Sequence, residues 1–403
     1  MEKTKGSPTM ILAGTAAYLF MGAMYVWSVL RIELTKVFPS FTAAQMSMTF
    51  TLMMICFCLG GFAGGKLTER KTPGLSLRLA SVLILLGYLG ASLMELCQAP
   101  GAALAVLYLF LSVFMGFGVG IGFNACMANI APWFPGHVGL VTGVLMMGFG
   151  MSSLVFAFVI EAICPAIGVF NVLRALGVAI FLVVFAASFF VKKPPLPRET
   201  AGKAGEHDCT TRQMLSRPSF WIYFIWNTLC GAAGLLVINN AANIAEYFGL
   251  AAGLGLVVSL FNGCGRPVVG AIVDRFGRFP SMFIMILMLL IASLMLLFAD
   301  HSGRYAFMFV GIILVGIVYG GGGTISIKVI RELYGPSHFA VNHSIANFCV
   351  IAASLVGPFL SGLLQDVSGG FSSTFLMLFV MAVLGLALLF LLIAAVKREE
   401  KRR

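Results

Sequence analysis

The sequence is dominated by apolar stretches that are each about as long as a lipid bilayer is thick. Crossing the hydrocarbon core takes roughly 20 apolar residues in a helix. Such stretches occur near residues 10–30, 47–65, 79–97, 104–127, 139–163 and 171–191, and again near 220–244, 251–273, 281–299, 305–327, 342–364 and 374–396. The pattern predicts an all-α polytopic membrane protein with twelve transmembrane helices in two six-helix halves.

The composition excludes an ordinary soluble protein. Apolar residues make up 60% of the chain and charged residues 10%, whereas soluble domains have about 45–50% and about 25%. The nine cysteines lie mostly inside the apolar stretches. With no paired CxxC motif near histidines, they predict neither a metal site nor a disulfide framework, and we expect no cofactor.

One long polar segment divides the chain. It runs over residues 192–219, contains four prolines and six Lys or Arg residues, and separates an N-terminal half (1–191) from a C-terminal half with a basic tail (220–403). If the N-terminus is cytoplasmic, loops on that side hold 21 Lys and Arg residues against 4 on the other side. Cytoplasmic loops carry such an excess. We therefore expect a multi-pass protein of the plasma membrane, here a bacterial inner membrane, with both termini cytoplasmic.

The net charge of +11 follows from the same asymmetry and from attraction to anionic lipid headgroups. Membrane lipids are therefore expected partners, and a nucleic acid is not. The sequence gives no sign of an oligomer, and a monomer is the default expectation.

A short motif occurs twice, about half a chain apart. The first copy is Gly65-Lys66-Leu67-Thr68-Glu69-Arg70, and the second is Gly270-Ala271-Ile272-Val273-Asp274-Arg275-Phe276-Gly277-Arg278. Transporters built from repeated halves show such duplication. A bland alternative is a basic hairpin that only obeys the positive-inside rule. The acid beside an arginine favours a latch, and we expect gating roles for Glu69, Arg70, Asp274, Arg275 and Arg278.

These two copies resemble the loop signature of the major facilitator superfamily. A narrower resemblance, to the oxalate/formate antiporter family, comes from further stretches of the chain. They are Tyr25-Val26-Trp27-Ser28, Gly118-Val119-Gly120-Ile121-Gly122-Phe123, Asn262-Gly263-Cys264-Gly265-Arg266 and Gly357-Pro358. The resemblance implies a transporter that exchanges small carboxylates across a bacterial membrane.

Arg266 is the most informative single residue. An arginine near the middle of a transmembrane helix costs about 2.5–3.5 kcal/mol on insertion scales, so it normally faces a polar cavity or a partner. No acid lies one turn away in its own helix. A guanidinium can hold a carboxylate with two parallel hydrogen bonds. An anionic substrate is the favoured partner, and a distant structural acid is the alternative.

The family resemblance places further residues at the substrate site. It implies substrate contacts for Tyr25, Phe123, Tyr319 and Asn347. It also places Val350 where oxalate-handling members have a lysine. One fixed cation balances one carboxylate, and a second buried carboxylate would be unbalanced. Monocarboxylates are therefore favoured over oxalate.

His343 precedes Asn347 by four residues and shares its helical face. Histidine titrates near neutral pH, so proton coupling through His343 is a hypothesis; a structural, hydrogen-bonded histidine is the default.

The absence of other motifs narrows the class of function. The sequence has no Walker loop for ATP and no HExxH or GxSxG motif of an enzyme. The leading hypothesis is a secondary active transporter of a small organic anion that works by alternating access, as an antiporter or as a proton symporter. A transporter-like receptor or sensor, and a transporter of a non-carboxylate substrate, remain open.

Overall fold

The structure is a computed structural model that describes residues 7–130, 133–134, 138–193, 208–255, 257–335 and 339–401. Within these residues all regular structure is helical. Twelve helices are long and apolar enough to cross a membrane, which confirms the all-α prediction. Half of the linker, residues 194–207, lies outside the described residues.

The first six spans come from the N-terminal half. They are formed by α1 (Pro8–Met21) with α2 (Trp27–Val37), α3 (Ala43–Arg70), α4 (Pro73–Ser92), α5 (Pro100–Val106) with α6 (Gly116–Ile130), α7 (Val138–Ile167) and α8 (Val169–Ala187).

The second six spans follow the short helix α9 (Thr211–Leu215). They are formed by α10 (Pro218–Tyr247), α11 (Ala252–Gly255) with α12 (Val257–Phe276), α13 (Arg278–Ser302), α14 (Tyr305–Tyr334), α15 (Phe339–Ala346) with α16 (Cys349–Ser354) and α17 (Leu360–Ser368), and α18 (Ser372–Lys401). Several of these helices extend past the predicted apolar stretches, because their polar ends also continue the helix.

Local sequence signals set several helix starts. Thr42 and Gln45 form a reciprocal capping box at the start of α3, which satisfies backbone N–H groups that have no partner inside the helix. Pro73 and Pro218 occupy the first turns of α4 and α10, where the missing N–H costs nothing. These signals separate helices whose apolar content alone would not show where one ends and the next begins.

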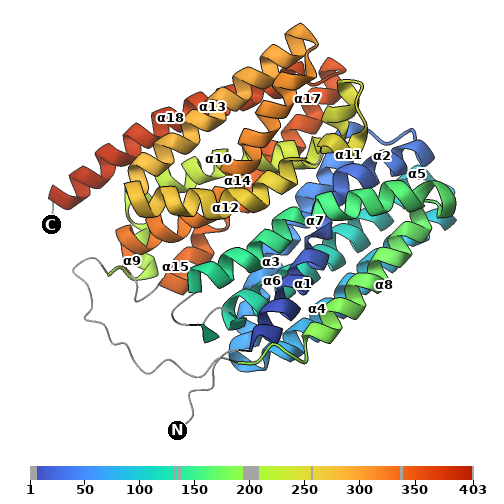
Figure 1. Ribbon diagram of the computed structural model, residues 1–403, viewed down its shortest axis with the longest axis horizontal. Helices are drawn as coiled ribbons and strands as arrows, with labels where there is room; N and C mark the ends of the chain where they lie inside the picture. Colours follow the sequence, from blue (N-terminus) through green and yellow to red (C-terminus); the bar gives the residue numbers. More distant parts are fainter. Residues whose placement is uncertain are drawn as a thin grey trace.

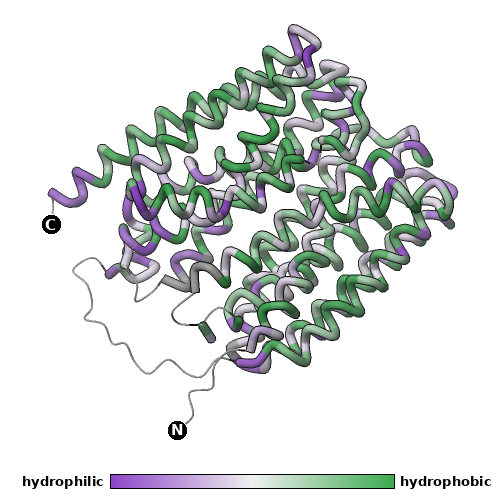
Figure 2. Tube along the Cα trace, in the orientation of Figure 1, coloured by the Kyte–Doolittle hydropathy of each residue, from purple (hydrophilic) through white to green (hydrophobic). Residues whose placement is uncertain are grey.

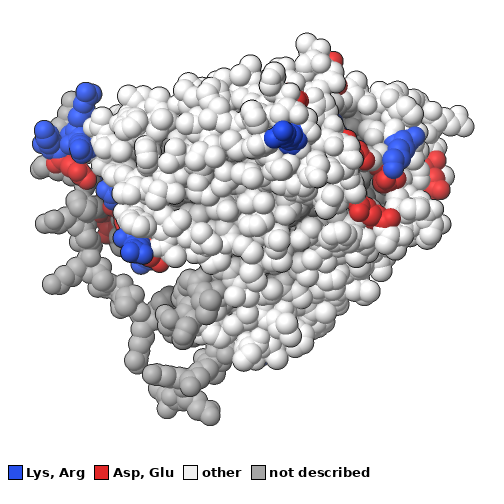
Figure 3. Space-filling model, turned by 45° about the horizontal axis from the view of Figure 1, so that its top comes forward, with Lys and Arg blue, Asp and Glu red and all other residues white. Residues whose placement is uncertain are grey.

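The two halves lie side by side in Figure 1, and both chain termini lie at one end of the bundle. We call this the termini end and the other the opposite end. Hydrophobic residues cover the middle of the helices in Figure 2, and in Figure 3 the charged side chains gather mainly toward the two ends of the face shown. Large apolar side chains such as Phe158 and Leu182 are exposed. In a membrane these side chains would lie against the hydrocarbon core of the bilayer, which is apolar and contains no water.

Three spans are interrupted rather than continuous. The first contains a 3₁₀ segment, Gly22–Val26, between α1 and α2. The fourth has a π-helical segment, Leu107–Met115. The eleventh, expected as one helix over 342–364, breaks at residues 347–348 and has a π-helical segment around Pro358. A proline removes one helical hydrogen bond and clashes with the preceding turn, so the wider turn there has a local cause.

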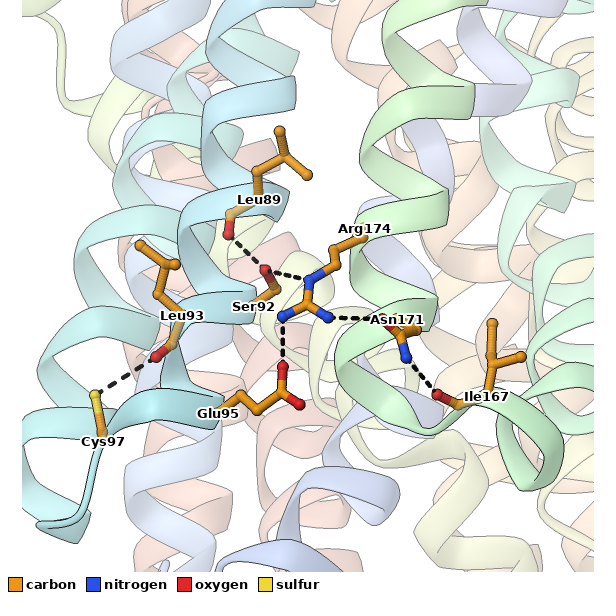
Figure 4. Close-up of polar contacts among 8 residues, drawn as sticks. All are labelled: Leu89, Ser92, Leu93, Glu95, Cys97, Ile167, Asn171 and Arg174. Atoms are coloured by element: carbon orange, nitrogen blue, oxygen red, sulfur yellow. Dashed lines mark hydrogen bonds and ion pairs between the residues drawn. The ribbon is translucent and has the colours of Figure 1, made fainter.

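A polar cluster joins two helices of the N-terminal half at the opposite end (Figure 4). Arg174 on α8 forms an ion pair with Glu95, and its Nε donates to Ser92 Oγ at 3.2 Å. Its Nη1 donates to Asn171 Oδ1 at 2.6 Å. All four residues belong to one half, so this cluster stabilises the packing of α4 and α8 within that half.

Candidate functional site

Arg266 lies near the middle of its span and projects toward the N-terminal half. It is on α12, ten residues before the helix ends at Phe276. Its Nη1 contacts the sulfur of Met146 on α7 at 3.2 Å. Its Nε is buried and has no hydrogen-bond partner. Among the described residues no carboxylate lies within ion-pair distance of it. The site therefore holds a cation that no carboxylate of the described residues neutralises.

Three tyrosines lie near this cation. Tyr25, in the 3₁₀ segment of the first span, lies 3.2 Å from Tyr319 on α14, hydroxyl to hydroxyl. Arg266 interacts electrostatically with both of them and with Tyr18 on α1. Tyr25 is only 6% exposed. Three of the predicted site residues, Arg266, Tyr25 and Tyr319, thus meet, although they come from three spans and both halves.

Two glycines explain how α12 and α14 come so close. A Cβ on Gly320 would lie 2.1 Å from the carbonyl oxygen of Asn262, and a Cβ on Gly265 would lie 2.7 Å from the Cα of Ile317. Such distances exclude any larger residue unless the helices separate. Because Tyr319 precedes Gly320 and Arg266 follows Gly265, this close packing brings the tyrosine and the arginine together.

The other two predicted site residues, Phe123 and Asn347, line a separate small cavity of about 80 Å³. It lies between α3, α6 and the break in the eleventh span, on the side of the termini end. Its lining residues are Phe57, Cys58, Gly61, Phe62, Phe123, Asn124, Asn347 and Phe348.

An aromatic cluster connects the two places. The Phe149 ring lies 5.2 Å from Tyr25 and 5.1 Å from Phe123. Tyr18 donates a hydrogen bond to the carbonyl oxygen of Phe123 at 2.8 Å. The five predicted residues therefore belong to one continuous region.

His343 lies on α15, one turn before Asn347 and before the break in the eleventh span. Proton coupling through this residue stays a prediction. Val350, at the start of α16, is partly buried and packs against the apolar core.

The predicted gating residues lie at the termini end. Lys328 contacts Asp274 at 3.6 Å, and Arg278 contacts Glu332 at 3.2 Å and Glu400 at 3.8 Å. These ion pairs all lie within the C-terminal half, where they connect α12, α13, α14 and α18.

The rest of the predicted gating set makes fewer contacts. The Asp274 side chain is 82% exposed. Arg275 lies over the ring of its neighbour Phe276, and Arg70 is exposed at the end of α3. The side chain of Glu69 lies outside the described residues. The latch role stays a prediction.

Sequence reasoning missed two residues near the path between the halves. Tyr18 was not singled out, although its spacing from Tyr25, seven residues, places both on one helical face. Arg31 lies just past the first predicted stretch, which ends near residue 30, but α2 continues to Val37 and buries it. The signal was present, because the apolar pattern continues past residue 30 at Ile32 and Leu34.

The sequence is similar to known transporters. The family model of the Major Facilitator Superfamily matches residues 7–321 and 234–403. The chain is 26% identical over 341 residues to an uncharacterized MFS-type transporter, YhjX, of Escherichia coli, covering 83% of this chain and 82% of that one. It is 23% identical over 401 residues to the oxalate:formate antiporter of Oxalobacter formigenes, covering 98% and 93%.

Solved transporters share the fold. The inward-open xylose transporter XylE from Escherichia coli superposes with a TM-score of 0.71 at 17% identity, over 95% of each chain. A bacterial homologue of the human lysosomal transporter Spinster also gives 0.71, at 16% identity, over 98% of this chain and 99% of that one. The helical architecture and the family match agree, and the chain belongs to the major facilitator superfamily.

Proposed function

We propose that this transporter carries a small organic anion, in particular a monocarboxylate, and that Arg266 binds the carboxylate. The observation that carries the proposal is the guanidinium of Arg266, which has a buried Nε without a hydrogen-bond partner and, among the described residues, no carboxylate within ion-pair distance. A cation held in a low-dielectric site without a counter-ion favours an anionic ligand. Charge-assisted hydrogen bonds from a guanidinium to a carboxylate are about twice as strong as neutral ones.

The tyrosines suit the same ligand. A bound carboxylate would have the guanidinium on one side and the hydroxyls of Tyr25 and Tyr319 as neutral donors nearby. Hydroxyls can donate to a carboxylate oxygen without adding a charge. The site thus supplies one positive charge, which balances the charge of one carboxylate, and several hydrogen-bond donors for its oxygens.

A second carboxylate would be less well accommodated. Val350, at the position where the family resemblance expects a lysine, has an apolar side chain that packs against the core. Burying an unpaired carboxylate is costly. Relatives differ in what their names state: one is an oxalate:formate antiporter and another, of Danio rerio, is monocarboxylate transporter 10. The single fixed cation favours the monocarboxylate alternative.

The contacts between the halves support alternating access. Among the described residues, hydrogen bonds between the halves lie at the middle and toward the opposite end, for example Arg31 with Asn240 and Ala43 with Asp366. We further propose that the protein lies in the bacterial inner membrane with both termini cytoplasmic. On that orientation, this conformation is closed to the outside.

The test is ligand binding followed by transport. Purified protein is screened by thermal shift against formate, acetate, pyruvate, lactate and oxalate, with a neutral sugar and a quaternary amine as controls. A ligand that binds the folded state raises its apparent stability. We expect monocarboxylates to stabilise the protein and the controls not to do so. Stabilisation by a control ligand alone would favour a non-carboxylate substrate.

A receptor or sensor is the other class of function to exclude. It would bind the anion without moving it. Uptake of the labelled anion into proteoliposomes loaded with the unlabelled anion separates the two, because a receptor gives binding and no accumulation. We expect accumulation inside the vesicles that depends on the internal anion or on a proton gradient. Binding without accumulation would favour a receptor.

A further inference from the structure

A second arginine lies between the two halves, nearer the opposite end. Arg31 is on α2, six residues after Tyr25, which corresponds to about 9 Å along the helix at about 1.5 Å per residue. It is only 5% exposed. Its Nη1 donates to Asn240 Oδ1 on α10 at 2.9 Å, so the contact joins the two halves.

A network of neutral groups surrounds this contact. Gln365 on α17 donates to the same Asn240 oxygen at 3.2 Å and to Ser361 Oγ at 2.9 Å. Asn240 in turn donates to the carbonyl oxygen of Leu236 at 2.9 Å and toward Ser361 Oγ at 3.3 Å. The contact partner of Arg31 is therefore an amide that other groups hold in place.

The charge of Arg31 is not neutralised by an ion pair. Among the described residues no carboxylate lies within 4.0 Å of its guanidinium. Asp366 interacts with it electrostatically, but the carboxylate of Asp366 accepts hydrogen bonds from the backbone N–H groups of Ala43 and Ala44, both at 2.9 Å. A structural role alone would be served more cheaply by a neutral side chain, since burying a charge without a counter-ion is costly.

The outer rim of the same end carries acids. Glu33 pairs with Lys36 at 2.6 Å, and Glu246 interacts electrostatically with Lys36, Glu33 and Glu161. With three acids and one lysine this group has a net negative charge, which disfavours anions. Arg31 lies between these acids and Tyr25. An anion that enters from the opposite end would therefore pass the acids first and then meet Arg31.

We propose that Arg31 is a second anion-binding position on the transport path, which a carboxylate occupies when the opposite end opens and before it reaches Arg266. Asn240 holds the guanidinium while that end is closed. When α2 and α10 separate, the bond to Asn240 breaks and the guanidinium becomes free for two hydrogen bonds to the carboxylate. This inference rests on the proposed function, because it takes the same class of substrate.

The test compares variants that remove the charge with one that removes only the contact. Arg31→Gln removes the charge, Arg31→Lys keeps it, and Asn240→Ala breaks the same contact but leaves the arginine. Arg174→Gln is the matched control, because Arg174 lies at the same end but pairs with Glu95 within one half. Initial uptake rates of labelled formate, acetate, pyruvate and lactate are measured in intact cells and in inverted vesicles, at low and high ionic strength.

We expect Arg31→Gln to lower kcat/KM at least tenfold for entry from the opposite end and to change the equilibrium Kd of the purified protein less than threefold. The ionic-strength dependence of entry from that side should also fall, because a screened attraction is lost. Arg31→Lys should lose less on the same side, and it serves as the test if the glutamine variant does not reach the membrane. Asn240→Ala and Arg174→Gln should not lower entry selectively from that side.

Three results would overturn the proposal. Equal effects of Arg31→Gln and Asn240→Ala would mean that the contact only closes the end. Parent-like entry in Arg31→Gln would remove any role on the path. A loss of equilibrium binding as large as that of Arg266→Gln would place Arg31 in the central site. Failure of the proposed function is seen separately, as a parent protein that binds and transports no carboxylate at all.

Discussion

Replacing Arg266 with glutamine should remove most of the carboxylate affinity, because the variant keeps a polar but shorter side chain and loses the cation. Leaving one member of a buried charge pair alone costs about 3–5 kcal/mol, and a tenfold change in Kd corresponds to about 1.4 kcal/mol. Arg266 is only partly buried as a whole residue, which favours the lower limit. We therefore expect binding to weaken by about 100-fold or more.

Arg266→Lys refines the same prediction. Lysine keeps the charge but not the planar fork that makes two parallel hydrogen bonds. One charge-assisted hydrogen bond contributes about 1.5–3 kcal/mol, so the lysine variant should bind at least about tenfold more weakly than the parent and more tightly than the glutamine variant.

The assay for both variants is isothermal titration of purified protein with formate, acetate, pyruvate and lactate. Arg174→Gln is the control, because its charge lies in the N-terminal half and away from the site. If Arg174→Gln binds with the affinity of the parent, the loss of an arginine elsewhere in the protein does not by itself weaken carboxylate binding. If Arg266→Gln binds monocarboxylates as tightly as the parent does, the anion site has been placed wrongly.

The remaining predictions concern selectivity, gating and pH. Val350→Lys should shift preference toward oxalate by about tenfold, if its amine pairs with the second carboxylate; tight oxalate binding by the parent would refute the one-cation argument. Asp274→Asn should slow exchange more than it changes Kd, and unchanged exchange at normal expression would count against a latch. His343→Gln should leave the pH dependence of uptake unchanged between pH 6 and 8, because a histidine in a structural role carries no proton with the substrate. A changed profile would instead support proton coupling.

The sequence was sufficient to predict the spans and the central cation. Long apolar stretches identify transmembrane helices because the bilayer fixes their length. Arg266 could be recognised because a lone arginine inside such a stretch is costly without a purpose. Both inferences depend only on which residues lie near one another in the sequence, so a single sequence is enough to make them.

What depends on tertiary packing could not be predicted. The eleventh span breaks at residues 347–348, between α15, which packs against α14, and α16, which packs against α10 and α3. The local sign was Pro358 further along. The close approach of Arg266 and Tyr319 depends on glycines in α12 and α14 that let the two helices pack tightly. Arg31 fell just outside the first predicted stretch, because the end of a helix is the least certain part of a prediction from sequence.

Counterflow in proteoliposomes tests the central claim most directly. Vesicles that contain the parent protein or Arg266→Gln are loaded with unlabelled formate, acetate, pyruvate or lactate, and entry of the same labelled anion is followed over time. The account predicts rapid, transient accumulation with the parent for at least one of these anions, and none above empty vesicles with Arg266→Gln. Equal accumulation by both proteins, or none by the parent with any of the four anions, would contradict it.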